Sequence, residues 1–227
     1  MTRLAAQEKM QFYPTPLPVA TEIARRLVLP ETGDGIIRLL DPCAGDGKPL
    51  QLVGDYLKAR DTEERFEIET WGAELHPGRA KEAAERLDKV VEAPFQSINW
   101  KPRHGLATVL FLNPPYDTSE HSEYRRQETY FLKKATQALV KDGILIYIIN
   151  PSSADWHTGK MLYENYFALE FFRFPDGLYD RFHQLVVMGR KREEPVNWYS
   201  YSDDVYAFQA LDGRSYSHYD PPPLHDF

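Results

Sequence analysis

Residues 36–47 read Ile-Ile-Arg-Leu-Leu-Asp-Pro-Cys-Ala-Gly-Asp-Gly, and this stretch decides the fold class. Its first five residues form a short, mostly apolar run that is typical of a buried strand. Asp41 ends the run, and Gly45 and Gly47 then allow a sharp backbone turn and the close approach of a ligand. Apolar residues recur at helical spacing over 50–57. The stretch therefore predicts a strand, a ligand-binding loop and a helix whose first amides face the same crevice.

Strand-like and helix-like segments alternate from about residue 17 to residue 150. Repeated strand–helix–strand units predict a mainly parallel sheet with helices on both faces. Helical spacing of apolar residues predicts helices over 17–29, 50–57, 80–87, 131–143 and 160–167, the fourth of them closed by Gly143. Apolar or alternating runs predict strands over 36–40, 66–74, 90–91, 108–112 and 144–149, and a closing strand pair over 168–174 and 184–189.

The composition excludes several classes of protein. The chain has 227 residues, of which 42% are hydrophobic and 27% are charged, as in an ordinary globular protein. This argues against collagen, a membrane bundle and a wholly disordered chain. The formal net charge is −7, so the chain lacks the overall basic character of a stand-alone nucleic-acid binder. A role on nucleic acid must therefore rest on a local patch or on a partner.

Cysteine and histidine usage gives no sign of a disulfide or of a metal site. The single cysteine, Cys43, cannot form an intramolecular disulfide, and the histidines do not share metal-ligand spacing. The first residues lack the apolar core of a signal peptide, and the longest apolar run is far too short to span a bilayer. We expect a cytoplasmic protein with no metal and no membrane contact.

Two further signals stand where predicted strands end. Glu74 closes one strand, and in doubly wound folds an acid at this place accepts hydrogen bonds from ribose hydroxyls. Asn113, Pro114, Pro115 and Tyr116 follow another strand directly. The two prolines fix the loop shape, while the Asn113 side chain and the Pro114 carbonyl accept hydrogen bonds. The Tyr116 ring offers a flat face on which a second ring can stack.

In this order, the motifs resemble those of class I S-adenosylmethionine-dependent methyltransferases of the adenine-N6 type. Residues 41–47 resemble the methionine-binding motif I of this family, and Glu74 resembles its ribose-binding acid. Residues 113–116 match its catalytic (N/D)PP(Y/F) motif literally. Residues 12–16, Phe-Tyr-Pro-Thr-Pro, resemble the motif that precedes motif I in the γ arrangement and helps to close the cofactor site. The resemblance covers roughly residues 11–191.

The resemblance implies a Rossmann-like, doubly wound α/β fold whose mainly parallel seven-stranded sheet ends in an antiparallel closing hairpin strand. It implies catalysis by Asn113, Pro114, Pro115 and Tyr116, with Tyr116 and Phe182 on either side of the target base. The implied cofactor, S-adenosyl-L-methionine, would contact Tyr13, Thr15, Pro16, Asp41, Cys43, Ala44, Gly45, Gly47, Glu74, Leu75 and Phe95.

Two places in the sequence bear on these implied roles. The family often carries an acid, before an apolar ring contact, that accepts a hydrogen bond from the cofactor adenine. Here Phe95 is preceded by Pro94, and the nearest acid is Glu92. Phe182 stands where the family has an aromatic residue before the last hairpin strand, although a core phenylalanine at a strand start explains it equally well.

The resemblance implies methyl transfer to an exocyclic amino group, with adenine N6 in DNA as the leading substrate. The lone pair of such an amine is delocalised into the ring, which makes the amine a poor nucleophile. Catalysis would therefore depend on acceptors for its N–H groups and on placing its nitrogen in line with the sulfonium methyl group. An RNA amino group, a protein glutamine amide and a non-catalytic methyltransferase-like subunit remain alternatives. Restriction–modification, phage defence and housekeeping modification are all open.

The sequence changes character after residue 193. We expect a catalytic domain over 1–193 and an irregular, aromatic and proline-rich extension over 194–227. The thirty-five residues after Arg192 are too few for a typical independent recognition domain. We therefore expect a nucleic-acid substrate, DNA before RNA, and a separate recognition subunit, loose sequence preference or a truncated chain. The aromatic residues of the extension would dock a partner or cover the core.

Overall fold

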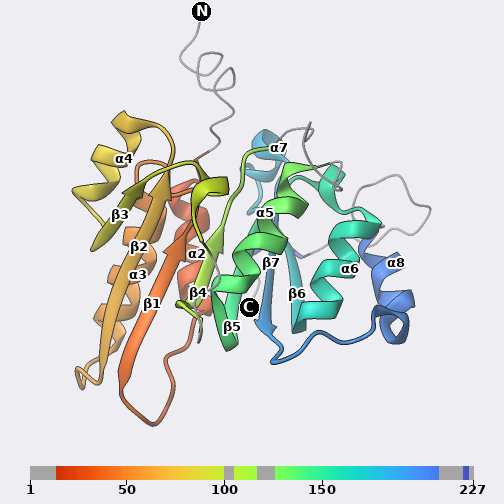
Figure 1. The fold of residues 1–227 in the computed structure, drawn as a ribbon, viewed down its shortest axis with the longest axis horizontal. Coiled ribbons are helices and arrows are strands. Elements are labelled where there is room, and N and C mark those ends of the chain that lie inside the picture. Colours follow the sequence, from red (N-terminus) through yellow and green to blue (C-terminus); the bar gives the residue numbers. More distant parts are fainter. Residues whose placement is uncertain (1–13, 100–104, 117–125, 210–221, 225–227) are drawn as a thin grey trace, which may run out of the picture.

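One seven-stranded sheet organises the part of the chain that the computed structural model describes, residues 14–99, 105–116, 126–209 and 222–224 (Figure 1). The strand order is β3-β2-β1-β4-β5-β7-β6. The first five strands in this order pair in parallel, and β7 runs antiparallel to both β5 and β6. The strands are β1 (Gly35–Asp41), β2 (Phe66–Glu74), β3 (Lys89–Glu92), β4 (Ala107–Leu112), β5 (Leu139–Ile149), β6 (Tyr166–Arg173) and β7 (Leu185–Lys191). The predicted doubly wound α/β sheet is confirmed.

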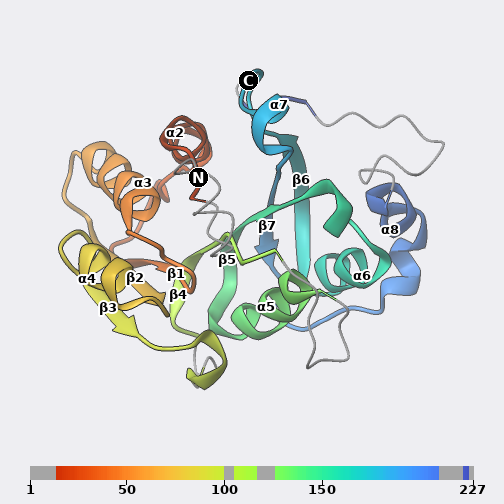
Figure 2. The same cartoon turned by 90° about the horizontal axis from the view of Figure 1, so that it is seen from above.

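Helices cover both faces of this sheet. Seen from above, α2 and α3 lie on one side and α5 and α6 on the other, while α8 lies beyond α6 (Figure 2). The helices are α2 (Leu17–Arg26), α3 (Lys48–Arg60), α4 (Pro77–Ala84), α5 (Gln127–Ala135), α6 (Trp156–Asn165), α7 (Tyr179–Phe182) and α8 (Ser202–Gln209). Five of these seven match or overlap predicted helical segments, whereas α7 and α8 were not predicted.

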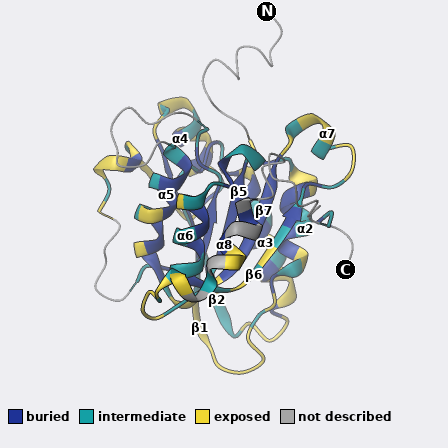
Figure 3. Cartoon of the chain, turned by 90° about the vertical axis from the view of Figure 1, so that its right-hand side faces the viewer, coloured by how far each residue is buried: buried dark blue, intermediate teal, exposed yellow. Residues whose placement is uncertain are grey.

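The two layers of helices enclose two separate cores, because neighbouring residues of a strand point to opposite faces. Leu39 packs with α2 and α3, whereas its neighbour Leu40 packs with α5 and α6. The same alternation divides Phe111 from Leu112. Buried residues consequently fill the centre of the molecule, while the outer faces of the helices are exposed (Figure 3). A sheet covered on both faces explains why its strands read as nearly continuous apolar runs.

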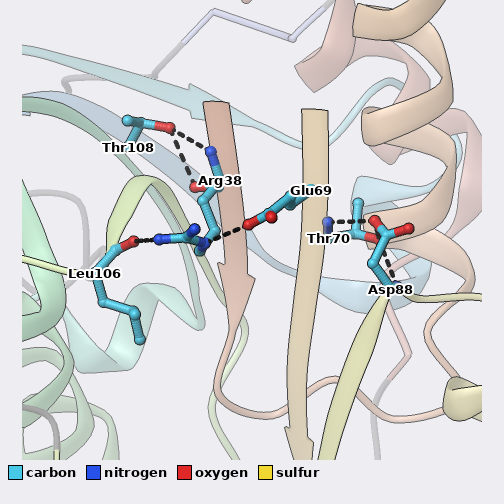
Figure 4. A network of polar contacts seen from close by, with 6 residues as sticks. All are labelled: Arg38, Glu69, Thr70, Asp88, Leu106 and Thr108. Atoms are coloured by element: carbon cyan, nitrogen blue, oxygen red, sulfur yellow. Dashed lines mark hydrogen bonds and ion pairs between the residues drawn. The ribbon is translucent and has the colours of Figure 1, made fainter. Parts of the chain in front are cut away.

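Polar contacts fix the central strands against one another (Figure 4). Arg38 of β1 donates from Nε to Glu69 Oε2 of β2 at 2.6 Å and from Nη1 to the Leu106 carbonyl at 2.9 Å. The Arg38 backbone also exchanges two hydrogen bonds with the Thr108 hydroxyl of β4. These contacts align β1 with both of its neighbours, so that their carboxyl ends lie at one edge of the sheet.

The segment after α5 differs from the prediction of one helix over 131–143. The helix ends at Ala135, a short 3₁₀ turn follows, and β5 already begins at Leu139. The helical spacing of Phe131, Ala135 and Leu139 is misleading, because Leu139 belongs to the strand. Gly143 does not close a helix but lies in β5, where a β-carbon would come within 3.0 Å of the Thr108 carbonyl.

Two smaller differences lie nearer the C-terminal end. The helix predicted over 160–167 begins earlier, at Trp156, and ends at Asn165, because Tyr166 and Phe167 already belong to β6. The region predicted to be irregular contains α8, and Phe208 of that helix is 2% exposed within the core that α5 and α6 share. This part of the extension therefore covers the core. Its assignment as a separate unit stays a prediction.

Candidate functional site

A cavity of about 370 Å³ opens at the carboxyl ends of β1, β2, β3 and β4. This is the edge of an open α/β sheet at which ligands bind, and the volume falls within the usual range of small-molecule sites. It is lined by Pro14, Thr15, Asp41, Pro42, Cys43, Ala44, Asp46, Pro49, Ala73, Glu74, Leu75, Arg79, Ala93, Phe95, Gln96, Asn113, Pro114, Pro115, Gln127 and Phe131. Three motifs that lie far apart in the sequence therefore share one cavity.

Glu74 is the buried acid at the centre of this wall, with 6% of its surface exposed. Its Oε2 accepts a hydrogen bond from the Gly45 amide at 3.0 Å, which ties the end of β2 to the loop after β1. Its Oε1 accepts from the His76 amide at 2.8 Å and from Arg79 Nη2 at 2.7 Å. The carboxylate is thus held in a fixed orientation before any ligand arrives.

Asp41 is a second buried acid in the same cavity, 3% exposed. Burial is the main cause that raises the pKa of its carboxyl to about 8, and the charge of Glu74 raises it further. The Cys43 amide donates to Asp41 Oδ1 at 2.8 Å and lowers the pKa in part. Near neutral pH, Asp41 is therefore mostly protonated and becomes a carboxylate where a cation approaches it. Burial also raises the pKa of the Cys43 thiol, which makes this group a poor nucleophile.

The loop between β1 and α3 needs a glycine at position 47. Gly47 has a φ of +80° and forms the N-cap of α3. A β-carbon at this position would lie 3.1 Å from the Ala83 Cα of α4. Gly45, with a φ of +56°, places its amide against Glu74. The two glycines therefore shape the wall through their backbone, and neither lines the cavity itself.

Asn113 directly follows β4 and takes part in a chain of side-chain hydrogen bonds. Its Nδ2 donates to Thr15 Oγ1 at 3.0 Å. Its Oδ1 accepts from the Tyr116 hydroxyl at 2.7 Å. Gln184 Nε2 in turn donates to the Tyr116 hydroxyl at 2.8 Å. Contacts on both sides of the amide thus fix which way its oxygen points.

The cavity brings together most of the residues that the sequence singled out. Ten of them line it: Thr15, Asp41, Cys43, Ala44, Glu74, Leu75, Phe95, Asn113, Pro114 and Pro115. Pro16, Gly45, Gly47, Tyr116 and Phe182 do not, and Tyr13 lies outside the described residues. Pro16 is the N-cap of α2, and Phe182 packs beside Phe174 with a ring-centroid distance of 6.3 Å.

Several lining residues were missed by the sequence analysis. Arg79 lies in the first turn of α4, and its ion pair with Glu74 can be recognised only once the fold is known. Gln96 and Gln127 are ordinary polar residues in the sequence, and no motif marks them. Glu92, considered as a displaced acid, is exposed and does not line the cavity. Gln184, which follows the predicted aromatic Phe182 by two residues, is the residue of that segment that reaches the catalytic loop.

Neither a metal site nor a membrane span stands out where the structure describes the chain. Over the described ranges, no group of three or more His, Cys, Asp or Glu side chains is placed to hold a metal ion. The described helices are all too short or too polar to cross a bilayer.

Three solved structures with the same fold are described as methyltransferases of different kinds. A putative class I S-adenosylmethionine-dependent methyltransferase from Listeria monocytogenes has a TM-score of 0.66 and 11% identity, with 92% of this chain and 77% of that chain covered. The methyltransferase subunit of a type I restriction-modification system from Streptococcus thermophilus has a TM-score of 0.58 and 15% identity, with coverages of 88% and 53%. A 16S rRNA N2 G1207 methyltransferase from T. thermophilus has a TM-score of 0.53 and 15% identity, with coverages of 79% and 44%.

These similarities establish the fold, and this chain spans about half the length of the second and third proteins. No curated protein matches the sequence. The model of an uncharacterised methyltransferase family, DUF6094, matches residues 1–208.

Proposed function

The chain belongs to the methyltransferase family DUF6094, and from that premise we propose that it methylates an exocyclic amino group, adenine N6 in DNA. Its methyl donor is S-adenosyl-L-methionine, the cofactor named for the Listeria monocytogenes structure with the same fold. The observation that carries this function is the shared cavity. Asp41 and Glu74 line it together with Asn113 and Pro114, so a cofactor held by the two acids lies beside the two acceptors for an amine.

The residues that line the cavity suit the cofactor. Glu74 faces the cavity with a fixed carboxylate, which would accept hydrogen bonds from the ribose hydroxyls. Asp41 would ionise against the cationic part of the cofactor. Leu75 and Phe95 both line the cavity, and Phe95 is held in place by stacking on Phe131, so these side chains would contact the adenine. The neighbouring Gln96 offers an amide in the region where the family often has an acid.

The chemistry needs placement more than a strong base. Asn113 Oδ1 and the Pro114 carbonyl would accept the two N–H bonds of the target amine, which favours a nitrogen with an available lone pair. When bound, S-adenosylmethionine would supply the methyl group: its S–CH₃ bond would break as the N–CH₃ bond forms, and the amine would release one proton to water. Tyr116 would stack on the target base once it is extruded from the duplex.

DNA is the preferred substrate because the motif set, including residues 12–16, follows the nucleic-acid branch of the resembling family. The restriction-modification neighbour is consistent with this choice. The net charge of −7 argues that a partner subunit supplies sequence recognition. An RNA amino group and a protein glutamine amide are the alternatives that the experiment must separate.

The test incubates the full chain with isotopically labelled S-adenosylmethionine and DNA, RNA or total protein, followed by mass spectrometry of nucleosides and peptides. We expect label in N6-methyladenine from DNA. Label in RNA or protein alone would refute the DNA assignment, and the absence of detectable S-adenosylmethionine binding by calorimetry would refute the enzyme itself.

The Asn113→Ala variant tests the catalytic loop. We expect it to lose transfer by a factor of about 100 or more and to keep cofactor binding, because the acceptor acts on the amine. Asn197→Ala is the matched control, since Asn197 is exposed and remote in sequence from the cavity residues. Undiminished transfer by Asn113→Ala would contradict the assigned role.

A further inference from the structure

We infer that Gln184 is a positioning residue for methyl transfer, which acts through the hydroxyl of Tyr116 on the amide of Asn113. Gln184 lies between α7 and β7 and is 3% exposed. Its Nε2 donates to the Tyr116 hydroxyl at 2.8 Å, and that hydroxyl lies 2.7 Å from Asn113 Oδ1. This buried amide contacts a catalytic loop that lies 68 residues earlier in the sequence, so it is not an ordinary surface polar group.

The local backbone explains why this side chain points inward. His183, directly before it, has a φ of +47° and ends the single turn of α7. This left-handed residue reverses the chain, so that β7 begins one residue after Gln184. The Gln184 carbonyl accepts a hydrogen bond from the Phe174 amide at 3.0 Å, which anchors the position against the end of the neighbouring strand. The main chain of Gln184 is thus held firmly while its side chain faces the loop after β4.

The hydrogen bonds that link Gln184, Tyr116 and Asn113 run in one direction. A side-chain amide nitrogen only donates, so the Tyr116 hydroxyl acts as an acceptor toward Gln184. Its own single proton is then available to Asn113 Oδ1 at 2.7 Å, in preference to the Ile148 carbonyl at 3.4 Å. On its other side, Asn113 Nδ2 donates to Thr15 at 3.0 Å. Gln184 therefore sets the direction in which the tyrosine hydroxyl donates, and with it the side of the amide that carries the acceptor oxygen.

Because this role rests on the proposed function, its consequence is a prediction about the chemical step. The Asn113 oxygen must be aimed at the target amine, and the Tyr116 ring must be in place before the base arrives. Without Gln184, the tyrosine hydroxyl loses the donor that fixes its orientation and can rotate between the Asn113 oxygen and the Ile148 carbonyl, so both groups lose their fixed geometry. The cofactor contacts proposed for Asp41 and Glu74 involve neither residue, so we expect cofactor affinity to change little.

The experiment is a double-mutant cycle between Gln184→Met and Tyr116→Phe in the full chain. Methionine keeps the length of the side chain and removes its hydrogen bond, and phenylalanine removes the hydroxyl from the other end of the same contact. Asp180→Asn is the control, since Asp180 is exposed in the same segment. For each variant, kcat and KM for methyl transfer, the S-adenosylmethionine Kd by calorimetry and the thermal unfolding midpoint are measured.

We expect Gln184→Met to lower kcat by about 10- to 100-fold, with the cofactor Kd within about twofold of the wild-type value. The double variant should be no slower than the slower single variant, because both substitutions remove one interaction. Losses in kcat that multiply, an unchanged kcat in Gln184→Met, or a parallel weakening of cofactor binding would overturn the inference.

A wild-type chain that transfers no methyl group would refute the proposed function instead. In that event the coupling between Gln184 and Tyr116 is measured from thermal stability. The unfolding midpoints of the wild type, the two single variants and the double variant report their contact directly. Independent, additive shifts of the midpoint would overturn the inference without reference to activity.

Discussion

The affinity for S-adenosylmethionine should rise steeply with pH below pH 8, because Asp41 must lose a proton when a cation binds beside it. The pKa of this carboxyl in the unliganded protein is about 8. At pH 6, two units lower, ionising Asp41 costs about 3 kcal/mol, since one pKa unit corresponds to about 1.4 kcal/mol. Through Asp41 alone, the Kd should therefore fall by about 50-fold between pH 6 and pH 8 and by about twofold more above that.

Calorimetry measures this effect in two ways. Titrations at pH 6, 7, 8 and 9 give the Kd, and repeats in buffers of different ionisation enthalpy give the number of protons released on binding. We expect release of close to one proton at pH 6 and about half a proton at pH 8. Asp41→Asn is the control, because an amide cannot ionise, and it also corrects for the amine of the cofactor, which itself titrates near pH 8.

Two results would refute this reasoning. A Kd that is independent of pH in the wild-type protein would mean that Asp41 stays neutral in the complex and does not meet the cationic group. The same slope in Asp41→Asn would assign the titration to another group. Either outcome would remove Asp41 from the proposed cofactor contacts while leaving Asn113 untouched.

Three further predictions concern the same cavity. The folded-state pKa of Asp41 exceeds its usual value, so its contribution to stability is fully present below about pH 4 and is lost as the pH rises toward 8. Asp41→Asn should therefore stabilise the unliganded protein at pH 7 by on the order of 4 kcal/mol, as measured by urea unfolding. Arg79→Met should weaken cofactor binding about tenfold by calorimetry, because it frees the Glu74 carboxylate that the guanidinium orients; an unchanged Kd would contradict this. Gly47→Ala should lower stability by about 3 kcal/mol through its positive φ and its contact with α4, whereas Gly33→Ala, with a positive φ and open space around it, should lose only about 1 kcal/mol; equal losses would show that the contact with α4 is unimportant.

The fold could be predicted from the sequence where a strand is buried on both faces and ends at a polar residue. The strand over 66–74 was predicted with the bounds that the structure gives it, and the strand ending at Asp41 nearly so. The prediction failed at Leu139, where helical spacing continues across a boundary. The spacing of apolar residues records which side chains are buried, and both a helix and the following strand bury Leu139.

The site could be predicted where a residue belongs to a loop at a strand end, as for Asp41, Glu74 and Asn113. These positions converge because parallel strands place their carboxyl ends at one edge. Arg79 and Gln184 could not be predicted in this way, because each acts through a side chain of another element. Their roles depend on distances between elements, and a single sequence does not contain these distances.

The two buried acids of the cavity differ in how their charge is balanced, and this difference suits their separate tasks. Glu74 has two backbone donors and a guanidinium, so its negative charge is already balanced before a ligand arrives. Asp41 has one backbone donor among the described residues, and burial beside Glu74 opposes its ionisation. A group held in this state gains most from a cation that enters the cavity, because the ligand supplies the balancing charge that the protein lacks. The destabilisation expected at Asp41 in the unliganded chain is therefore the same free energy that would favour S-adenosylmethionine over an uncharged analogue.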